Sequence, residues 1–407
     1  MRVCMIYDAD YPWDVRVEKI LSTLGDYGCD VHLICRNLGK KPTDEYLNNI
    51  HFHRMPYFNH DGINSSLSFP AFFNPLWLLT ILRVVKETSP NIIIVRDLPL
   101  TLSAVIIGRT YGIPVVFDMA ENYPAMVRDI WRFEGIKLAN LVVRNPFIVD
   151  AVEALCVKLV NSVLVVTEEA KSRLIARYHL DESRIHIVSN TPRLTDIYWT
   201  NSTDETPELA GAAKLIYIGG LQAGRSLEVV IRGIALCADK FDCSLTILGK
   251  GEGEPNLKKL VNRLNIREKV FFKGWVEHAA IGPFLSASDV GIVPHPATEH
   301  TNTTLPNKLF DYMAYAKPVL ASDTKPVQRI IESEGCGLIY GHESPEDFQE
   351  KLRQLADPKI RAKMGANGRK AIEEKYNWEV DSRNLLAQVL PYLPLTLKGR
   401  GITTSLS

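Results

Sequence analysis

The sequence predicts an α/β protein built from two parallel-sheet domains, and three features of its 407 residues support this prediction. Short β-branched runs alternate with longer amphipathic stretches, which is typical of strand-helix-strand units. The alternation occurs twice, and residues 201–211, which have no hydrophobic period, separate the two occurrences. The chain is also too long for one hydrophobic core. We therefore expect two Rossmann-like domains that face each other across a ligand cleft at the carboxyl ends of their strands.

The expected elements follow from the position of each apolar run. The first domain is expected over residues 1–200, with a helix at 15–27 and strands at 3–7, 31–35, 92–95, 115–117, 163–166 and 185–188. The second domain is expected over residues 212–377. Its expected strands are 215–218, 245–248, 270–272, 290–293 and 318–321, and its expected helices are 226–238, 256–264, 306–316 and 345–356.

Composition excludes several classes of protein. Hydrophobic residues make up 46% and charged residues 23%, which are ordinary values for a globular protein and unlike those of disordered or collagenous chains. Lys plus Arg equals Asp plus Glu at 47 each, so no overall positive charge favours nucleic acid. The seven cysteines are scattered and never spaced C-x-x-C, which argues against disulfides and zinc. With no signal peptide and no apolar run of about 20 residues, we expect a cytoplasmic protein.

Residues 69–85 form the most apolar part of the chain, although Pro70, Pro75 and Arg83 interrupt it. One interpretation is a helix packed in the core of the first domain. The other is a helix that lies in the plane of a membrane surface, at its inner face. In that case the residues at the headgroup boundary would be Phe72, Phe73, Trp77 and Leu78, flanked by Arg83 and Lys86.

The strongest chemical signal lies between residues 294 and 323. Pro306 suits the first turn of a helix, because its missing N–H would have no partner there. Backbone N–H groups from Thr304 to Lys308 would then point out of the helix start, where an anion such as a diphosphate binds well. Lys308 adds a full positive charge, and Asp311 is placed to accept hydrogen bonds from the vicinal hydroxyls of a ribose.

These residues resemble a known family. Residues 306–314 read Pro-Asn-Lys-Leu-Phe-Asp-Tyr-Met-Ala, and 317–323 read Lys-Pro-Val-Leu-Ala-Ser-Asp. The two together resemble the donor-binding motif of family 4 glycosyltransferases, which are retaining enzymes with the GT-B fold. Residues 8–19 resemble the first loop and helix of bacterial members, and 217–227 resemble the opening of their nucleotide-binding domain. The resemblance covers nearly the whole chain, and it implies that a final helix at 378–395 packs back on the first domain.

The resemblance implies a binding site for a nucleotide sugar in the second domain. Arg225 would grip the diphosphate with Lys308, although a plain glycine turn with a surface Arg is the alternative. Asp311 takes the place of the second of two acidic residues in the motif, and Thr303 replaces the first. Trp275 stands where the nucleobase is read. The donor-binding residues so implied are Gly219, Gly220, Arg225, Trp275, Thr303, Thr304, Leu305, Lys308 and Asp311.

The first domain would bind the acceptor. The family segment that usually offers a His has Ala120 in this sequence, so Glu121 and Asp118 become the candidate carboxylates. The catalytic candidates are therefore Glu121, Asp118, Arg225 and Lys308. Substrate contacts are expected from Asp14, Arg16, Asp97 and His295. Helix capping is the alternative role for both Asp14 and Glu121.

These expectations describe a retaining glycosyltransferase, of hexosyltransferase type, for surface polysaccharide biosynthesis. It would move a sugar from a nucleotide-diphosphate donor, with UDP favoured, to a glycan or lipid-linked acceptor. No metal and no cofactor are expected, because helix-terminus amides with Arg225 and Lys308 can neutralise the diphosphate. A nucleotide-sugar epimerase of the same fold and a non-catalytic nucleotide-sugar-binding relative are the alternatives, and Ala120 and Thr303 suggest the second.

Overall fold

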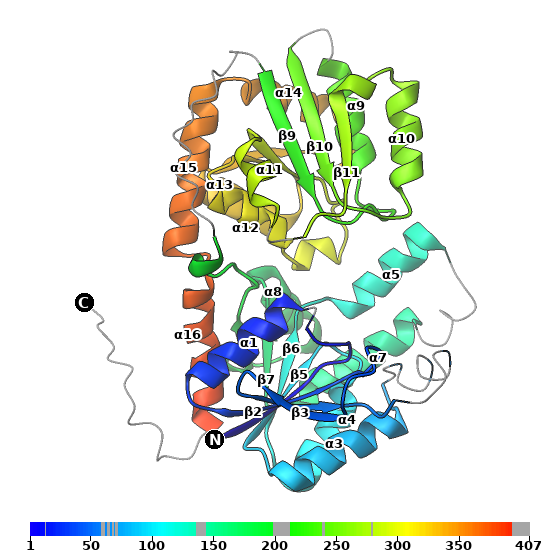
Figure 1. Cartoon of the computed structure of the whole chain (residues 1–407), viewed down its shortest axis with the longest axis vertical. Helices are drawn as coiled ribbons and strands as arrows, with labels where there is room; N and C mark the ends of the chain where they lie inside the picture. Colours follow the sequence, from blue (N-terminus) through cyan, green and yellow to red (C-terminus); the bar gives the residue numbers. More distant parts are fainter. Residues whose placement is uncertain are drawn as a thin grey trace. The chain divides into compact units, whose positions relative to one another are not determined.

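The computed structural model describes residues 1–12, 14–57, 62, 66, 69, 72–135, 144–197, 212–237, 241–277 and 280–392. The linker expected at 201–211 lies outside these residues. The chain divides into two compact units. Unit 1 comprises Met1–Val127, Ile136–Ser189 and Asp381–Ser407, and unit 2 comprises Arg128–Gly135 and Asn190–Val380. The described part of each unit contains one main sheet with helices packed against it (Figure 1).

In the described part of unit 1, one sheet has the strand order β3-β4-β2-β1-β5-β6-β7-β8. Its strands are β1 (Arg2–Ile6), β2 (Asp30–Cys35), β3 (Asp44–Leu47), β4 (Ile50–Arg54), β5 (Ile92–Arg96), β6 (Val115–Met119), β7 (Ser162–Val165) and β8 (Ile185–Ile187). The β3-β4 pair is antiparallel and the other pairs are parallel. The carboxyl ends of β1, β5 and β6 therefore meet at one edge of the sheet.

Helices cover this sheet, and short polar side chains cap several of them. These helices are α1 (Val15–Asp26), α3 (Pro75–Thr88), α4 (Thr101–Tyr111), α7 (Pro146–Leu159) and α8 (Glu168–Tyr178). A further helix, α5 (Tyr123–Glu134), begins in unit 1 and continues in unit 2. Asp14, Asn74, Asn145 and Thr167 accept hydrogen bonds from first-turn N–H groups of α1, α3, α7 and α8. Asp14 therefore has the capping role that was its alternative interpretation.

Unit 2 contains a parallel sheet in the order β11-β10-β9-β12-β13-β14. Its strands are β9 (Ala212–Ile218), β10 (Asp242–Leu248), β11 (Val270–Gly274), β12 (Val290–Val293), β13 (Val319–Ser322) and β14 (Gly337–Tyr340). Its helices are α9 (Leu227–Cys237), α10 (Glu254–Arg263), α11 (Gly282–Ser286), α12 (Asn307–Ala314), α13 (Lys325–Glu334), α14 (Pro345–Gln354) and α15 (Pro358–Glu374). The chain then forms α16 (Trp378–Val389), which begins in unit 2 and continues in unit 1.

The expected α/β alternation is confirmed in both units, and the exceptions have local causes. The antiparallel hairpin of β3 and β4 was not predicted, because β3 is short, mostly exposed and polar. The apolar segment expected at 69–85 forms α3, and its Trp77 is 0% exposed in the core of unit 1. The expectation that Trp77 lies at a headgroup boundary is therefore wrong, since Trp77 is on the buried side of the helix with Ile81 and Val84.

Candidate functional site

Two glycines bring two strand ends of unit 2 close together. Gly219 follows β9 with φ +143° and Gly249 follows β10 with φ +153°, conformations that side chains rarely adopt. A Cβ on Gly249 would lie 1.8 Å from the carbonyl oxygen of Gly219, and the Gly219 N–H donates to the Leu248 carbonyl over 2.9 Å. A Cβ on Gly219 would lie 2.7 Å from Lys308 Nζ. Glycine at both positions lets the backbone and the lysine approach each other.

Three basic side chains from different elements gather beside these glycines. Lys308 comes from the first turn of α12, Arg225 from the loop before α9, and His295 from the segment after β12. Arg225 NH1 donates to His295 Nε2 over 3.2 Å. Lys308 Nζ lies 4.0 Å from the centre of the Tyr217 ring, a cation-π geometry. The structure thus brings together Arg225 and Lys308, which the sequence placed in one site, and adds His295 to them.

The electrostatics of this cluster favour an anionic ligand. Burial lowers the pKa of Lys308 well below its usual range; the charge of Arg225 lowers it further, and Asp311 raises it. Burial also lowers the pKa of His295 well below its usual range, with Lys308 and Arg225 acting in the same direction. His295 is therefore neutral at pH 7, which matches its role as acceptor from Arg225. A bound diphosphate would relieve this crowding of positive charge.

Threonine hydroxyls in the segment before α12 form hydrogen bonds to the backbone of that same segment. Thr303 is buried and its Oγ1 donates to the His300 carbonyl over 2.9 Å, and Thr304 Oγ1 makes a longer bond of 3.4 Å to the same oxygen. The helix begins at Asn307, one residue later than expected, and Pro306 is its N-cap with no side-chain cap bond. The first turn at Asn307 and Lys308 lies next to the glycine turn, because the Lys308 ammonium reaches Gly219.

The remaining residues expected to bind the donor lie around this cluster. Gly220 accepts a 2.8 Å hydrogen bond at its carbonyl from the Tyr217 hydroxyl. Trp275 directly follows β11 and is 68% exposed. Leu305 and Asp311 are partly buried on either side of the α12 start. Sequence reasoning missed Tyr217; an aromatic residue two positions before a pair of glycines at a strand end was the available signal.

The expected acceptor residues meet at the carboxyl edge of the unit 1 sheet, but two of them bind each other. Arg16 Nε lies 3.1 and 3.0 Å from the two carboxylate oxygens of Asp118, and Arg16 NH2 lies 2.5 Å from Oδ1. Both side chains are fully buried. Although burial favours its neutral form, Arg16 and Arg96 hold the pKa of Asp118 below its usual range. This geometry does not fit the expected roles of Asp118 in catalysis and of Arg16 in binding substrate.

Arg96 links the other carboxylates of this edge. Its guanidinium contacts Asp14 Oδ2 at 3.2 Å and Asp97 Oδ1 at 3.2 Å, and it was missed because only its neighbour was singled out. Asp97 has φ +64° and is largely buried, and burial raises its pKa to about 8, while Arg96 lowers it and Asp8 and other nearby acids raise it further. Asp97, which was expected to contact the acceptor, therefore lies at the carboxyl edge of the unit 1 sheet as an acid with a raised proton affinity.

Glu121 lies on the segment that connects β6 to α5. The side chain of the next residue, Asn122, accepts from the Ala125 N–H over 3.3 Å, and its carbonyl accepts from the Met126 N–H over 2.8 Å. Asn122 therefore caps α5, and the alternative interpretation of Glu121 as the helix cap is not needed. Glu121 itself is partly buried.

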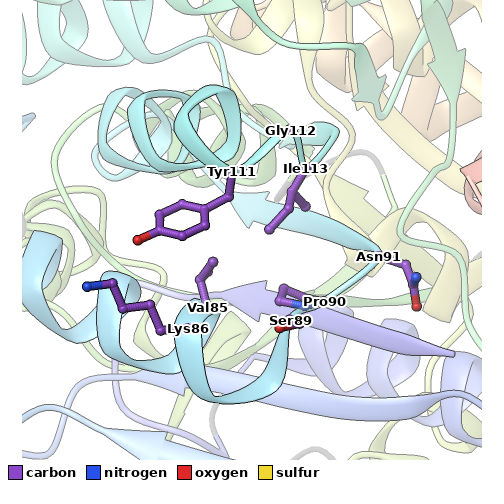
Figure 2. Close-up of a pocket in the computed structure, with 8 residues that line it drawn as sticks. All are labelled: Val85, Lys86, Ser89, Pro90, Asn91, Tyr111, Gly112 and Ile113. Atoms are coloured by element: carbon purple, nitrogen blue, oxygen red, sulfur yellow. The ribbon is translucent and has the colours of Figure 1, made fainter.

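A separate pocket of about 440 Å³ lies at the opposite edge of the unit 1 sheet, where β5 and β6 begin. It lies between the carboxyl ends of α3 and α4, and Figure 2 shows Lys86 and Tyr111 on the side opposite Asn91. The residues that line it are Val85, Lys86, Ser89, Pro90, Asn91, Tyr111, Gly112 and Ile113. None of them was predicted to bind donor or acceptor.

The described ranges contain neither a cluster of metal-binding side chains nor a helix that could span a membrane. No group of three or more His, Cys, Asp or Glu side chains there is arranged to hold a metal ion. Of the helices described, none has the length and apolarity to cross a membrane. His32, His51 and His53 do meet on β2 and β4, where their rings stack and His32 Nδ1 lies 3.0 Å from His53 Nε2.

Solved structures identify the fold. Sucrose-phosphate synthase from Thermosynechococcus elongatus matches with a TM-score of 0.77 and 15% identity over 96% of this chain and 100% of that one. Anabaena Alr3699/HepE in complex with UDP and glucose matches with a TM-score of 0.67 and 12% identity over 97% and 100%. With one mainly parallel sheet in each unit, the chain has the GT-B fold that the sequence predicted.

Family models give the particular family. The model described as "Glycosyltransferase Family 4" matches residues 15–191, and the model described as "Glycosyl transferases group 1" matches residues 212–357. The chain belongs to the family 4 glycosyltransferases.

Two curated glycosyltransferases are similar in sequence to parts of this chain. Alpha-D-kanosaminyltransferase of Streptomyces kanamyceticus is 24% identical over 279 residues, which are 67% of this chain and 69% of the relative. Lipopolysaccharide core biosynthesis glycosyltransferase LpsE of Rhizobium meliloti is 23% identical over 215 residues, which are 47% of this chain and 60% of the relative. Together with the family models, these similarities support glycosyl transfer in polysaccharide biosynthesis.

Proposed function

We propose that the protein transfers a sugar, with retention of anomeric configuration, from a UDP-sugar to a glycan or lipid-linked acceptor of a surface polysaccharide. The observation that carries the donor side is the cluster of Arg225, Lys308 and His295 beside Gly219. Two cations and a neutral imidazole that accepts from one of them leave positive charge to be neutralised, and a diphosphate supplies two negative groups.

The nucleoside would extend from this cluster toward Trp275 and Asp311. Asp311 stands one helical turn after Lys308, so its carboxylate can accept from ribose hydroxyls while Lys308 contacts phosphate. The exposed indole of Trp275 offers a flat surface beside the glycine turns, where a base can stack. Uridine is proposed because the HepE structure contains UDP; that ligand is a property of HepE and supports, by similarity, a test of UDP first.

We propose the following chemistry for retention. The acceptor hydroxyl oxygen bonds to the anomeric carbon on the face from which the diphosphate leaves, and the bond from that carbon to the β-phosphate oxygen breaks. The departing phosphate oxygen takes the hydroxyl proton, so no separate base is required. Arg225 and Lys308 stabilise the charge that develops on the leaving group. Glu121, rather than Asp118, is proposed to orient the acceptor by accepting a hydrogen bond from a second acceptor hydroxyl next to the one that reacts, because Asp118 is bound to Arg16.

The acceptor is proposed to be presented at a membrane surface. LpsE carries a lipopolysaccharide function in its name, which suggests a lipid-linked acceptor by similarity. In unit 1, α3 packs on α4 and α4 on α7, and all three helices expose large apolar side chains (Figure 1). Leu79 on α3 is 62% exposed and Phe147 on α7 is 80% exposed. The other such residues on these helices are Ile106, Tyr111, Ile148 and Leu155, and the exposed Phe73 lies just before α3.

Charge on the same three helices favours an anionic bilayer as the partner. Each helix has a basic residue in its last turn, namely Lys86 on α3, Arg109 on α4 and Lys158 on α7, and all three are exposed. Basic side chains next to exposed apolar ones bind the headgroups of anionic lipids while the apolar groups enter the interface. We define these helices as the α3-α4-α7 face and propose that it contacts the inner face of the plasma membrane.

Binding and turnover of nucleotide sugars test the proposed function. UDP-, GDP- and ADP-sugars should be titrated against the protein and against Arg225→Ala, with Arg232→Ala on the exposed side of α9 as the matched control. Tight binding of UDP-sugars that Arg225→Ala loses and Arg232→Ala keeps is the expected result. Turnover is then followed with a crude lipid extract as acceptor, and the anomeric configuration of the product is read by NMR.

The alternatives give different results in the same assays. Exchange between epimers of a UDP-sugar without acceptor would show an epimerase. Binding without transfer to any acceptor would show a non-catalytic relative, for which Ala120 and Thr303 were the sequence signals. Equal binding by Arg225→Ala and wild type would remove Arg225 from the donor site.

A further inference from the structure

Arg16 is an unusual residue for its position. It is the second residue of α1, where the partial positive charge of the helix end opposes a cation, and it is almost completely buried. Asp14 already caps this helix by accepting from the Arg16 and Val17 N–H groups. The arginine therefore contributes nothing that the helix start needs, while its burial is costly. Its contacts must explain its presence.

The guanidinium joins two segments that are far apart in the sequence. Nε and NH2 bind the carboxylate of Asp118 at the end of β6, and NH1 donates to the carbonyls of Val188 at 2.8 Å and Ser189 at 3.1 Å. A planar guanidinium can hold a carboxylate with one side and two carbonyls with another, which a lysine ammonium cannot reproduce.

The second of these segments is where the chain passes from unit 1 to unit 2. Unit 1 ends at Ser189, and the chain returns to it at Asp381. The Ser189 N–H donates to Asp381 Oδ1 over 3.0 Å, so the two crossings are bound to each other on the unit 1 side. On the unit 2 side, the Trp378 N–H donates to the Pro192 carbonyl over 2.8 Å. We call the two places where the chain passes between the units, near Ser189 and Asp381, the double crossing. Arg16 therefore binds one strand of a double crossing whose two strands are hydrogen-bonded to each other in both units.

The first segment leads directly into the proposed acceptor site. Asp118 is followed by Met119, Ala120 and Glu121, and Asn122 then starts α5. α5 itself passes from unit 1 to unit 2 between Val127 and Arg128. The position of Glu121 is consequently fixed at one end by the bond between Asp118 and Arg16, and at the other by a helix that enters unit 2.

We propose that Arg16 is a positioning residue for glycosyl transfer, which holds the segment bearing Glu121 in register with the double crossing at Ser189 and Asp381. The proposal rests on the proposed function in giving Glu121 a contact with a hydroxyl of the acceptor. It assigns Arg16 a structural link between the acceptor site and the connection of the two units, in place of the direct contact with substrate that the sequence suggested.

Arg16→Lys tests this proposal because it keeps the charge and removes the planar fork. The matched control is Arg173→Lys, since Arg173 of α8 also forms a buried ion pair in unit 1, with Glu153, and Glu153 also accepts a 2.7 Å bond from the Tyr178 hydroxyl. Both variants remove one buried arginine fork. Only Arg16→Lys should lower kcat, by roughly 10- to 100-fold for a displaced reacting group, with the KM for the donor unchanged.

Hydrogen exchange supplies a second readout that needs no acceptor. Peptides covering residues 119–126 should exchange faster in Arg16→Lys than in wild type and should be unaffected in Arg173→Lys. If Arg16→Lys does not fold, Asp381→Asn, which weakens the tie between the crossings, is measured in its place with the same expected directions.

Each outcome decides the proposal. Wild-type turnover in Arg16→Lys, or unchanged exchange of the 119–126 peptides, would overturn it, as would an equal loss of kcat in Arg173→Lys. A wild-type protein that transfers sugar to no acceptor would contradict the proposed function, and the exchange measurement would still decide whether Arg16 positions the segment.

Discussion

Lys308 Nζ lies 4.0 Å from the centre of the Tyr217 ring, and the hydroxyl of that ring donates to the carbonyl of Gly220. The Tyr217 side chain therefore makes a cation-π contact with Lys308 and a hydrogen bond to the turn at Gly219 and Gly220. The face of an aromatic ring attracts an ammonium without neutralising its charge. The ring consequently favours the ammonium form of Lys308, which can bind an anion, whereas burial and Arg225 favour the neutral form by lowering the lysine pKa.

UDP binding should be accompanied by uptake of protons. Without ligand, burial lowers the pKa values of both Lys308 and His295, and an adjacent diphosphate would raise them by favouring the charged forms. Between the lowered and raised pKa values the complex binds more protons than the free protein, so affinity should fall as pH rises. Calorimetry in buffers of different ionisation enthalpy measures the uptake. Proton release on binding would contradict this prediction.

Gly219→Ala should weaken nucleotide binding. The substitution places a Cβ 2.7 Å from Lys308 Nζ at a backbone φ of +143°, so either the ammonium or the turn must move, at a cost of about 1 to 3 kcal/mol. That cost corresponds to roughly a 5- to 150-fold loss of UDP affinity by titration if it falls on the bound state. Gly25→Ala is the control, because no atom lies within 4 Å of its Cβ. Equal affinity in Gly219→Ala and wild type would contradict the proposed site.

His32→Asn should flatten the pH dependence of stability in the acid range. Burial is the first cause that lowers the pKa of His32, with Asp30 opposing it and His53 and His51 adding to it. A histidine with a lowered folded-state pKa binds fewer protons in the folded than in the unfolded protein. Its folding is therefore penalised as pH falls below about 6.5, the unfolded value.

The free energy of unfolding in urea, measured from pH 7.5 to 5, checks the histidine prediction. Wild type should lose more stability over this interval than His32→Asn does. His179→Asn is the matched control, because His179 is exposed and asparagine accepts its left-handed backbone at φ +53°. A slope in His32→Asn as steep as that of wild type would show that His32 does not contribute to the pH dependence of stability.

The α3-α4-α7 face should bind vesicles that contain anionic lipid. A Leu79→Ser and Phe147→Ser double variant should float less with such vesicles than wild type does, because each exposed apolar side chain contributes to interfacial binding. Leu236→Ser is the control, since Leu236 is 42% exposed on α9 of unit 2. Flotation of the double variant at the wild-type level would argue against this face, and equal binding to neutral vesicles would argue against the role of Lys86, Arg109 and Lys158.

Much of the proposed donor site is encoded in short stretches of sequence. Gly219, Gly220 and Arg225 lie within seven residues after one strand, and Lys308 and Asp311 lie on one turn of one helix. Local geometry is enough to relate residues at such spacing. His295 was expected near the sugar, but its bond to Arg225 spans 70 positions and appears only in the folded chain.

The residues at the carboxyl edge of the unit 1 sheet were harder to predict, because Arg16 and Asp118 neutralise each other's charge. Asp118 and Arg16 stand 102 positions apart, and each taken alone is a polar side chain at a strand end or helix start. Such residues serve functional sites in many proteins, so sequence reasoning assigned Asp118 to catalysis and Arg16 to substrate binding. Pairing removes both from solvent, and no local pattern encodes a pairing at that distance.

The sequence by itself determined the order of strands and helices, the family, and the glycine and lysine of the proposed donor site, since periodicity, turn residues and helix starts act over a few neighbours. Tertiary structure decided which charges are available. It buried Arg16 against Asp118 and Trp77 against the sheet, while it left Phe147 exposed. The reason is physical: the free energy of a charge or a ring depends on what surrounds it in space, and those surroundings come from residues far away in the chain.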